Sequence, residues 1–298
     1  MTWSAISRAV LIALLVPFWG QTAGPLTRTP TAVGPAATRI VSIVPAVTEM
    51  LFAMGAGPSV VGVSSFDRHP PEVERVARVG ALVDPDVERV LALQPDLVIV
   101  YETQTEFREQ LRRAGIPCYA YVHGDLPSIT TTIRDLGHRL DISTAAEALA
   151  SDLEARLAAV ADRVRDRDRP RTMLVFDRQP GSLTGIVASG GVGFLHDMLV
   201  IAGGTNLFSD VDRQSLQVNT ETLLARGPDV IVELRYNTEL SPREIDDERR
   251  SWDKLPTLPA VRTGRVHVLS GNEFVVPGPR IAEATERLAR ALHPDAFE

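Results

Sequence analysis

Cysteine and lysine are almost absent from this chain of 298 residues. Cys118 is the single cysteine, so no internal disulfide can form, and we expect it to be a small buried apolar group. Lys254 is the single lysine, and acidic residues outnumber basic ones by 38 to 31, which gives a net charge of -7. A nucleic-acid partner requires a basic surface, so this composition argues against one.

Motifs that would indicate an enzyme are also missing. The glycines of 55–57 and 191–193 lack the third glycine and the strand–turn–helix setting of a dinucleotide site. Neither a G-x-S-x-G nor an H-E-x-x-H pattern occurs. The six histidines are scattered, and His69 and His123 fall at predicted strand ends, where an acid such as Asp67 would be needed to complete a metal site. We expect no catalytic residue, no metal site and no resident cofactor, while metal binding by the two histidines stays an open alternative.

No hydrophobic run is long enough to span a membrane comfortably. Residues 9–20 form an apolar run that follows Arg8, which is the pattern of a secretory signal peptide. We assign residues 1–23 to this signal and residues 24–38, rich in Pro, Gly, Ala and Thr, to a flexible leader. An uncleaved anchor is the alternative. Because no cysteine lies nearby, we do not expect a lipoprotein, and in either case the body of the protein is exported to the periplasm or another extracytoplasmic space.

Strand and helix patterns alternate from residue 39 onward, which is typical of a parallel α/β sheet. Residues from Ala145 to about Arg165 carry an apolar stripe at helical spacing, which predicts one helix roughly 30 Å long. The fold class that we predict is α/β, with two Rossmann-like lobes that have central parallel sheets and are joined by one long rigid α-helix. The boundaries are residues 39–142 for the first lobe, 143–169 for the linking helix and 170–298 for the second lobe.

A decapeptide pattern occurs twice and supports two lobes of similar build. Residues 88–97 (ERVLALQPDL) and 221–230 (ETLLARGPDV) share Glu, Leu, Ala, Pro and Asp at a constant offset. Each copy predicts a short amphipathic helix that is followed by a buried strand. We expect the apolar half of each copy to lie in the core. Glu88 and Glu221 would then stabilise the first turn of each helix, or would form a two-point acidic docking surface.

Ligands of open parallel sheets bind outside the carboxyl ends of the strands, and that rule selects the candidate binding residues. Aromatic side chains make up only 5% of the chain, yet several follow predicted strands, as expected of a cleft for a large, partly apolar ligand. The alternative for each ring is a place in the core of its own lobe. Arginines at similar positions suit carboxylate or phosphate groups. The candidates are Pro45, Phe66, Tyr101, Arg178, Arg235, Tyr236, Phe274 and Arg280.

Four segments resemble the substrate-binding proteins of ABC importers, in the single-helix-linked class that carries cobalamin, iron-siderophores and haem. They are residues 39–57, 60–72 (VVGVSSFDRHPPE), 87–100 and 202–208 (AGGTNLF). The segment with SSFDRHPP is most similar to the cobalamin-binding branch. The resemblance implies that Glu88 and Glu221 engage arginine pockets on two permease subunits, and that Phe66 takes the place of a ligand-contacting Tyr. The Trp residues common in that branch near Tyr101 and Glu273 are missing here.

These features together predict an exported solute-binding protein without enzymatic activity. It would capture a corrinoid, cobalamin-like ligand between its lobes and deliver it, as a monomer, to an ABC permease with its ATPase subunits. The first alternative is an iron-siderophore or haem binding protein, for which the arginines would matter more than the rings. A metal-ion binding protein is the second alternative. The third, from a different class, is a periplasmic hydrolase or metal-dependent enzyme, for which no converging set of residues occurs.

Overall fold

The computed structural model describes residues 37–236 and 240–298, so the predicted signal peptide and nearly all of the leader lie outside the described residues. Within that part of the chain, no helix is long and apolar enough to cross a membrane. The fold divides into two compact units. The N-terminal unit holds residues up to 122 together with 132–149, and the C-terminal unit holds 123–131 and 150–298.

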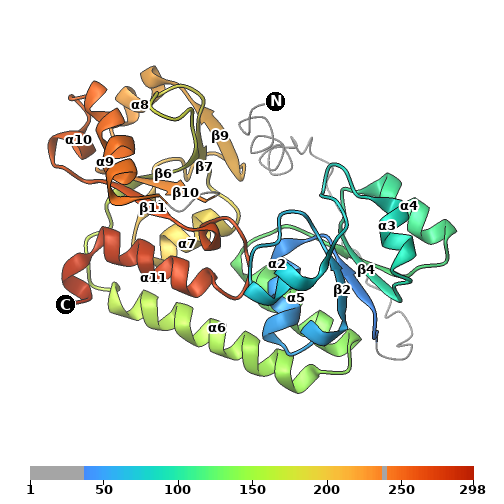
Figure 1. The fold of residues 1–298 in the computed structure, drawn as a ribbon. Helices are drawn as coiled ribbons and strands as arrows, with labels where there is room; N and C mark the ends of the chain where they lie inside the picture. The colour runs from blue at the N-terminus through green and yellow to red at the C-terminus, as the bar shows by residue number, and fades with distance from the viewer. Residues whose placement is uncertain (1–36, 237–239) are drawn as a thin grey trace. The chain divides into compact units, whose positions relative to one another are not determined.

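The N-terminal unit is built on a five-stranded sheet in the order β3-β2-β1-β4-β5, and every neighbouring pair is parallel (Figure 1). Its strands are β1 (Ile40–Ser42), β2 (Val60–Val63), β3 (Ala77–Arg78), β4 (Leu97–Tyr101) and β5 (Cys118–Tyr121). The helices are α2 (Pro45–Ala53), α3 (Val87–Ala92) and α4 (Thr105–Arg113), with α5 (Leu126–Arg139) assigned to both units in part. The parallel sheet predicted for this lobe is confirmed.

Apolar side chains on one face of this sheet pack against α3 and α4. Val41, Val98 and Val100 come from β1 and β4, and Phe107 and Leu111 come from α4. Cys118 is half-buried beside this cluster rather than fully buried as expected. The central strands are therefore enclosed, and polar side chains reach the surface mainly where the strands end.

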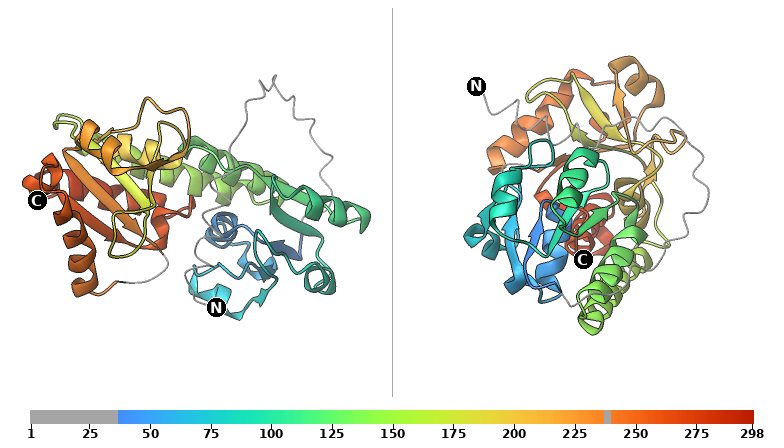
Figure 2. Two further views of the ribbon diagram at one scale, coloured as in Figure 1. Left: turned by 90° about the horizontal axis from the view of Figure 1, so that it is seen from above. Right: turned by 90° about the vertical axis from the view of Figure 1, so that its right-hand side faces the viewer.

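Helix α6 (Ser143–Arg163) is a single uninterrupted helix of 21 residues, as Figure 2 shows. At 1.5 Å per residue it extends roughly 30 Å, so the long helix predicted from the apolar stripe is confirmed. Its first turns belong to the N-terminal unit and the remainder to the C-terminal unit.

The C-terminal unit has a mixed sheet in the order β11-β10-β6-β7-β9, and the short β8 also pairs with β6. Strand β7 runs antiparallel to both of its neighbours, which corrects the prediction of a parallel sheet in this lobe. The cause is the connection of residues 178–185 between β6 and β7, because a parallel crossover needs a dozen or more residues. The strands are β6 (Arg171–Asp177), β7 (Ile186–Ser189), β8 (Thr205–Asn206), β9 (Ser215–Val218), β10 (Val230–Arg235) and β11 (Val266–Ser270).

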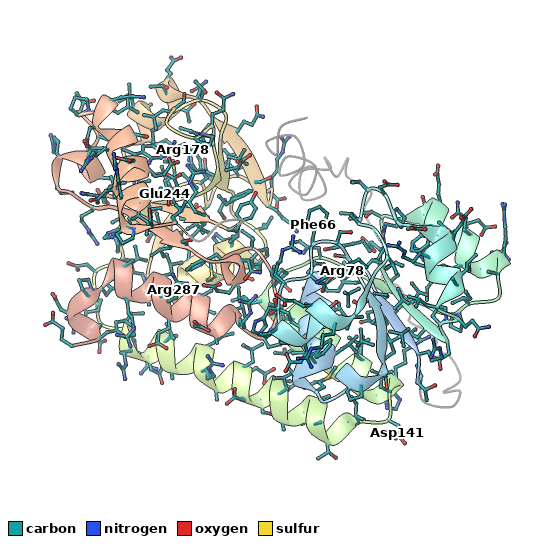
Figure 3. The ribbon with its side chains drawn as sticks, in the orientation of Figure 1. Phe66, Arg78, Asp141, Arg178, Glu244 and Arg287 are labelled. Carbon is teal, nitrogen blue, oxygen red and sulfur yellow. The ribbon has the colours of Figure 1, made fainter. Side chains whose placement is uncertain are left out.

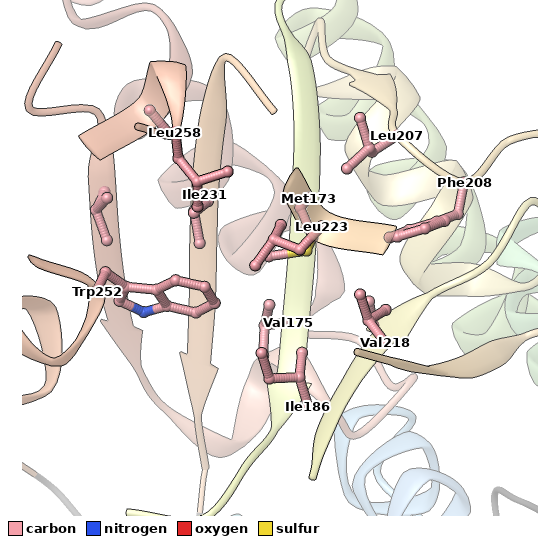
Figure 4. Packing of buried hydrophobic residues seen from close by; sticks show 13 residues of the cluster. Met173, Val175, Ile186, Leu207, Phe208, Val218, Leu223, Ile231, Trp252 and Leu258 are labelled. Carbon is pink, nitrogen blue, oxygen red and sulfur yellow. The ribbon is translucent and has the colours of Figure 1, made fainter. Parts of the chain in front are cut away.

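Helices cover both faces of this mixed sheet. Helices α7 (Phe194–Ile201) and α11 (Ile281–Leu292) lie side by side on one face (Figure 1). The other helices are α8 (Thr220–Arg226), α9 (Pro242–Arg250) and α10 (Pro259–Arg262). Trp252, Met173 and Ile231 are enclosed in an apolar cluster with Leu223 of α8 (Figure 4).

The Asp of the repeated pattern has the same structural role in both units. Asp96 accepts hydrogen bonds from the backbone N–H of Thr38 at 2.8 Å and of Arg39 at 2.9 Å. Asp229 accepts one from the backbone N–H of Arg171 at 3.1 Å. Each aspartate thereby ties the start of its own strand, β4 or β10, to the start of the neighbouring strand, β1 or β6.

The arginine at the start of β1 or β6 also has the same structural role in both units. The guanidinium of Arg39 donates to two carbonyl oxygens at the end of α3, and that of Arg171 donates to two at the end of α8. Gly55 and Gly203, each four residues after the leucine of a Met-Leu pair (Met50-Leu51 and Met198-Leu199), have the same φ of 84°. This left-handed conformation favours glycine, so the repetition in sequence is also a repetition in backbone structure.

Candidate ligand-binding site

Three of the predicted site residues lie at the carboxyl ends of the strands in the N-terminal unit. Pro45 opens α2 shortly after β1, where its fixed φ suits the first turn of a helix. Phe66 lies in the loop after β2, and Tyr101 is the last residue of β4. All three side chains are half-buried, so each retains some exposed surface. This placement matches the sequence prediction, and contact with a ligand stays a prediction.

Hydrogen bonds to the residues before and after Phe66 hold the loop that carries its ring. Arg78 Nη1 donates to the carbonyl oxygens of Ser64 at 2.9 Å and of Asp67 at 2.8 Å. The backbone N–H of Phe66 donates to Ser64 Oγ at 3.0 Å, and the backbone N–H of Ser64 donates to Asp67 Oδ2 at 2.9 Å. Figure 3 shows Arg78 and Phe66 in the same part of this unit. These hydrogen bonds fix the backbone of the loop from which the Phe66 ring extends.

Asp67 is the most unusual titratable group of this unit. Its side chain is enclosed, with the residue 1% exposed, and Oδ1 has no hydrogen-bond partner among the described residues. Burial raises the pKa of Asp67 to about 6, although hydrogen bonds from Thr48 and Ser64 and the charge of Arg78 oppose the shift. Burial, followed by the charge of Asp67, also raises the pKa of the Tyr101 hydroxyl. The phenol of Tyr101 is therefore neutral near neutral pH and can donate a hydrogen bond.

In the C-terminal unit, Arg178 follows β6 directly but does not reach solvent, since its side chain is 0% exposed. Its Nε donates to Glu233 Oε2 at 3.0 Å, and its Nη2 pairs with the Glu248 carboxylate. Nη1 donates to the carbonyl oxygens of Gln179 at 3.1 Å and Ser182 at 2.9 Å. The guanidinium therefore has internal partners, and the structure gives Arg178 a structural role while its contact with a ligand stays a prediction.

Arg235, the last residue of β10, completes a group of two arginines and two glutamates. Its Nη2 lies 2.7 Å from Glu233 Oε1 and donates to Glu248 Oε2 at 2.7 Å. Trp252 Nε1 donates to Glu233 Oε2 at 2.9 Å. Formal charges in the group cancel, which is the usual condition for burying charged side chains. Part of the Arg235 side chain remains exposed at 17%, and its Nε finds no acceptor among the described residues.

Tyr236 and Phe274, the two rings predicted in this unit, lie in different environments. Tyr236 directly follows β10 and is half-buried, and burial, with the charge of Asp177, raises the pKa of its hydroxyl. Phe274 is 0% exposed, and the guanidinium of Arg287 lies 4.8 Å from its ring centroid. The alternative that the ring belongs to the core of its lobe describes Phe274 in this structure, and contact with a ligand would require the ring to become exposed.

Arg280 lies beside Phe274 and is paired with an acid. Its Nη1 donates to Glu273 Oε2 at 3.4 Å and its Nη2 to Asn272 Oδ1 at 2.9 Å. The same Glu273 carboxylate accepts from Arg287. In the structure the carboxylate is buried and bound by two guanidinium groups.

The histidines considered for a metal site lie in different units. His69 follows the Phe66 loop, and His123 packs edge-on against Phe194 with ring centroids 5.3 Å apart. Burial lowers the pKa of His123 to about 4. Across residues 37–236 and 240–298, no three side chains of His, Cys, Asp or Glu are placed to hold a metal ion.

Glu88 and Glu221 occupy the same position of their helices, two residues after the N-cap. The caps are Asp86 and Asn219, whose side chains accept from the backbone N–H of Arg89 and Thr222 at 2.9 and 2.8 Å. Both glutamates are exposed. Because other side chains cap these helices, the fold does not require a carboxylate at either position, although one is favourable near the helix dipole.

The leucines of the repeated pattern correct a prediction. Leu91 is 39% exposed and Leu224 is 45% exposed, so this part of the pattern is not core. The residues that anchor the two helices are Val90 and Leu223, each 0% exposed. Adjacent apolar residues, such as Val90 and Leu91, cannot both face the sheet, because successive residues of a helix lie about 100° apart around its axis.

The sequence model of the family described as periplasmic binding protein matches residues 40–272. The chain belongs to the periplasmic binding protein family. A vitamin B12-binding protein of Salmonella typhimurium is 30% identical over 259 residues, which cover 86% of this chain and 91% of that protein. An uncharacterized ABC transporter substrate-binding lipoprotein of Bacillus subtilis, YvrC, is 27% identical over 266 residues, 87% of this chain and 81% of the relative.

Among solved structures, the periplasmic haem-binding protein RhuT from Roseiflexus sp. RS-1 is similar, with a TM-score of 0.72 and 28% identity. The similarity covers 88% of this chain and all of that chain. The two-lobed α/β fold and the family predicted from the sequence are thereby confirmed. The relatives differ in the ligand that their names state, and one of them is named a lipoprotein, a class that we did not expect for this chain.

Several residues that shape the site were not predicted as site residues. Arg78 gave no signal, because its two contacts depend on how β3 lies against the loop after β2. Glu233 stands inside an apolar strand pattern, VIVELR, and a lone acid in such a run is the signal that indicates a buried ion pair. Its partner Arg178 lies 55 residues earlier, so only the pairing of β6 with β10 reveals the contact.

Proposed function

We propose that this protein is an extracytoplasmic solute-binding protein that binds a corrinoid, cobalamin-like ligand and delivers it to an ABC permease without catalysing a reaction. Membership of the periplasmic binding protein family and the vitamin B12-binding relative support this function. Phe66 and Tyr101 in the N-terminal unit and Tyr236 in the C-terminal unit are partly exposed at the carboxyl ends of strands, and aromatic residues at such positions suit a large, partly apolar ligand.

The internal ion pairs of the candidate arginines favour a corrinoid over haem as the ligand. Arg178 and Arg235 share two glutamates, and Arg280 is bound to Glu273. A ligand with carboxylates, such as haem with its propionates, would have to displace these internal acids. The side chains of a corrinoid end in neutral amides, which form hydrogen bonds without requiring a free positive charge. Iron-siderophores with anionic groups meet the same obstacle.

Calorimetric titration of the purified protein with cyanocobalamin, cobinamide, haemin and ferric siderophores tests the ligand class. We expect both corrinoids to bind with a stoichiometry of one and haemin to bind at least tenfold more weakly. Tight haemin binding without corrinoid binding would establish the haem alternative instead. Metal analysis of the purified protein separates the metal-ion alternative, and turnover assays test the hydrolase alternative.

Delivery to the permease is assigned to Glu88 and Glu221. Both carboxylates are exposed at matching positions, and neither forms an ion pair with another described residue. Charge reversal of both, Glu88→Arg with Glu221→Arg, should abolish ligand uptake by cells that lack their own copy of the protein, while calorimetry shows unchanged ligand affinity. Normal uptake by the double variant would show that the two glutamates only stabilise the first turns of their helices.

A further inference from the structure

Large apolar side chains are rarely exposed in the described part of this protein. Six of them are: Val83, Leu91, Val122, Val192, Val200 and Leu224. Single exposed apolar residues are normal on protein surfaces and need no explanation. Two of these six, however, are the leucines at the same position of the repeated pattern, three residues after Glu88 and Glu221.

Neither leucine is needed to build its helix. Helix α3 is anchored by the buried Val90 and capped by Asp86, and helix α8 is anchored by the buried Leu223 and capped by Asn219. Helix propensity alone would allow a polar residue at the position of either leucine, and its own unit shields each leucine only in part. The exposed part of each leucine therefore adds nothing to the packing of its own unit.

Each leucine shares a helix face with an exposed glutamate. Residues three apart in a helix are neighbours on its surface, so Leu91 lies beside Glu88 and Leu224 beside Glu221. The next residues on these faces, Ala92 and Ala225, are also exposed and are small enough to allow close approach of another surface.

The nearby arginines do not neutralise the glutamates. Arg89 in α3 lies 3.8 Å from the Asp86 carboxylate, and Arg226 in α8 donates to Asp210 at 2.6 Å. Glu88 therefore keeps its charge available, and Glu221 does as well. A surface that presents an unpaired carboxylate beside an exposed leucine is complementary to a cation beside an apolar wall.

We propose that Leu91 and Leu224 are the apolar anchors of two docking surfaces for the permease. The first docking surface consists of Glu88, Leu91 and Ala92, and the second of Glu221, Leu224 and Ala225. Each leucine inserts beside its glutamate into a pocket of one permease subunit that pairs a guanidinium or ammonium group with an apolar wall. Because the same three residues recur in both units, the two subunits present pockets of the same chemistry. This inference rests on the proposed delivery to a permease.

The test first reconstitutes each ABC permease–ATPase complex of the source cell in nanodiscs. The complex whose ATP hydrolysis is accelerated by the wild-type protein is then used for the binding measurements. Dissociation constants are measured by biolayer interferometry for Leu91→Gln, Leu224→Gln and the double variant. Val200→Gln, an exposed apolar position on α7, is the matched control. Glutamine is close to leucine and better than valine in helix propensity, and all three positions are exposed, so we expect at most a small loss of thermal stability in the four variants.

Each single leucine variant should bind about fivefold more weakly. In the wild type the permease would bury the exposed part of the leucine, and the variant loses the free energy of that burial. The two effects should multiply to roughly 25-fold in the double variant, because the positions lie in different units. The control should bind like the wild type. Raising the salt concentration from about 0.15 to about 0.5 M should leave the leucine effects unchanged but weaken binding through the glutamates.

The outcomes separate this inference from the proposed function. If charge reversal of Glu88 and Glu221 abolishes binding while the leucine double variant binds like the wild type, the inference is wrong and the proposed function stands. If no permease responds to the wild-type protein, both are wrong. Loss of self-association in the leucine variants, measured by light scattering, with unchanged permease binding would overturn the inference in favour of a contact between two copies of this chain.

Discussion

Arg178 and Glu233 form an ion pair that is closed off from solvent, with Nε and Oε2 3.0 Å apart and the side chains 0% and 1% exposed. The pair joins the end of β6 to β10 at the carboxyl edge of the mixed sheet. It also holds Trp252 through the indole N–H. The same two glutamates that bind Arg178 also bind Arg235, so the last residue of β10 is tied to this buried group.

Replacement of Glu233 by Ala should destabilise the protein strongly. The change leaves the Arg178 guanidinium short of a buried partner and Trp252 Nε1 without its acceptor, and breaking one partner of a buried ion pair costs about 3–5 kcal/mol. Urea unfolding measures the loss. Glu286→Ala removes a carboxylate from an exposed pair with Arg290 and should cost less than about 1 kcal/mol. Equal losses for the two variants would show that burial of the ion pair is not the determining factor.

Replacement of Arg78 by Met should weaken ligand binding through the Phe66 loop. The variant removes the donor for the Ser64 and Asp67 carbonyl oxygens, so the backbone on both sides of Phe66 loses its support. Loss of hydrogen bonds from a charged donor predicts an affinity about tenfold lower, or roughly 1–2 kcal/mol. Arg75→Met, an exposed site three residues earlier, is the control and should bind like the wild type. Calorimetry that shows equal affinities for the two variants would contradict a positioning role of Arg78.

The buried carboxyl of Asp67 predicts an unusual dependence of stability on pH. Because burial raises its pKa from 3.8 to about 6 in the folded state, the unfolded chain releases this proton at lower pH than the folded protein does. The stability that the protonated group contributes is fully present below pH 3.8 and is lost as the pH rises through about 6. Relative to Asp67→Asn, the wild type should lose about 1 kcal/mol of unfolding free energy between about pH 5 and pH 7.5.

Urea unfolding of the wild type and of the Asp67→Asn variant across this range provides the measurement. The comparison removes the contributions of the other titratable groups, which are common to both proteins. Parallel stability curves for the wild type and the variant would show that Asp67 titrates normally.

Local patterns in the sequence predicted the elements of this fold, while contacts between distant strands had to come from the structure. The alternation of buried strands and amphipathic helices predicted the parallel sheet of the N-terminal unit, since periodicity reports which face is buried. Strand β7 was not foreseen as antiparallel, because its direction depends on the short connection after Arg178. The exposure of Leu91 was also missed, because Val90 and Leu91 are both apolar and the sequence does not say which of them faces the sheet.

The sequence predicted that the candidate residues lie at strand ends, but it did not predict which of them are buried. Phe66, Tyr101 and Tyr236 lie at strand ends as the rule for parallel sheets requires, and all three keep exposed surface. Phe274 and Arg178 also lie near strand ends but are enclosed. The difference arises from partners that are distant in sequence, such as Glu233 and Arg287, which only the folded arrangement brings into contact.

The two aspartates of the repeated pattern should differ in their contribution to stability. Asp96 accepts three hydrogen bonds, from the Thr38 and Arg39 backbone N–H groups and from Thr38 Oγ1, whereas Asp229 accepts one from the Arg171 backbone N–H. At about 1 kcal/mol for each hydrogen bond, Asp96→Ala should lower the unfolding free energy by roughly 2–3 kcal/mol and Asp229→Ala by about 1 kcal/mol. Urea unfolding followed by circular dichroism compares the two variants. Equal losses would mean that the backbone pairing of the strands, rather than the aspartate side chains, holds the start of β1 and of β6 in place.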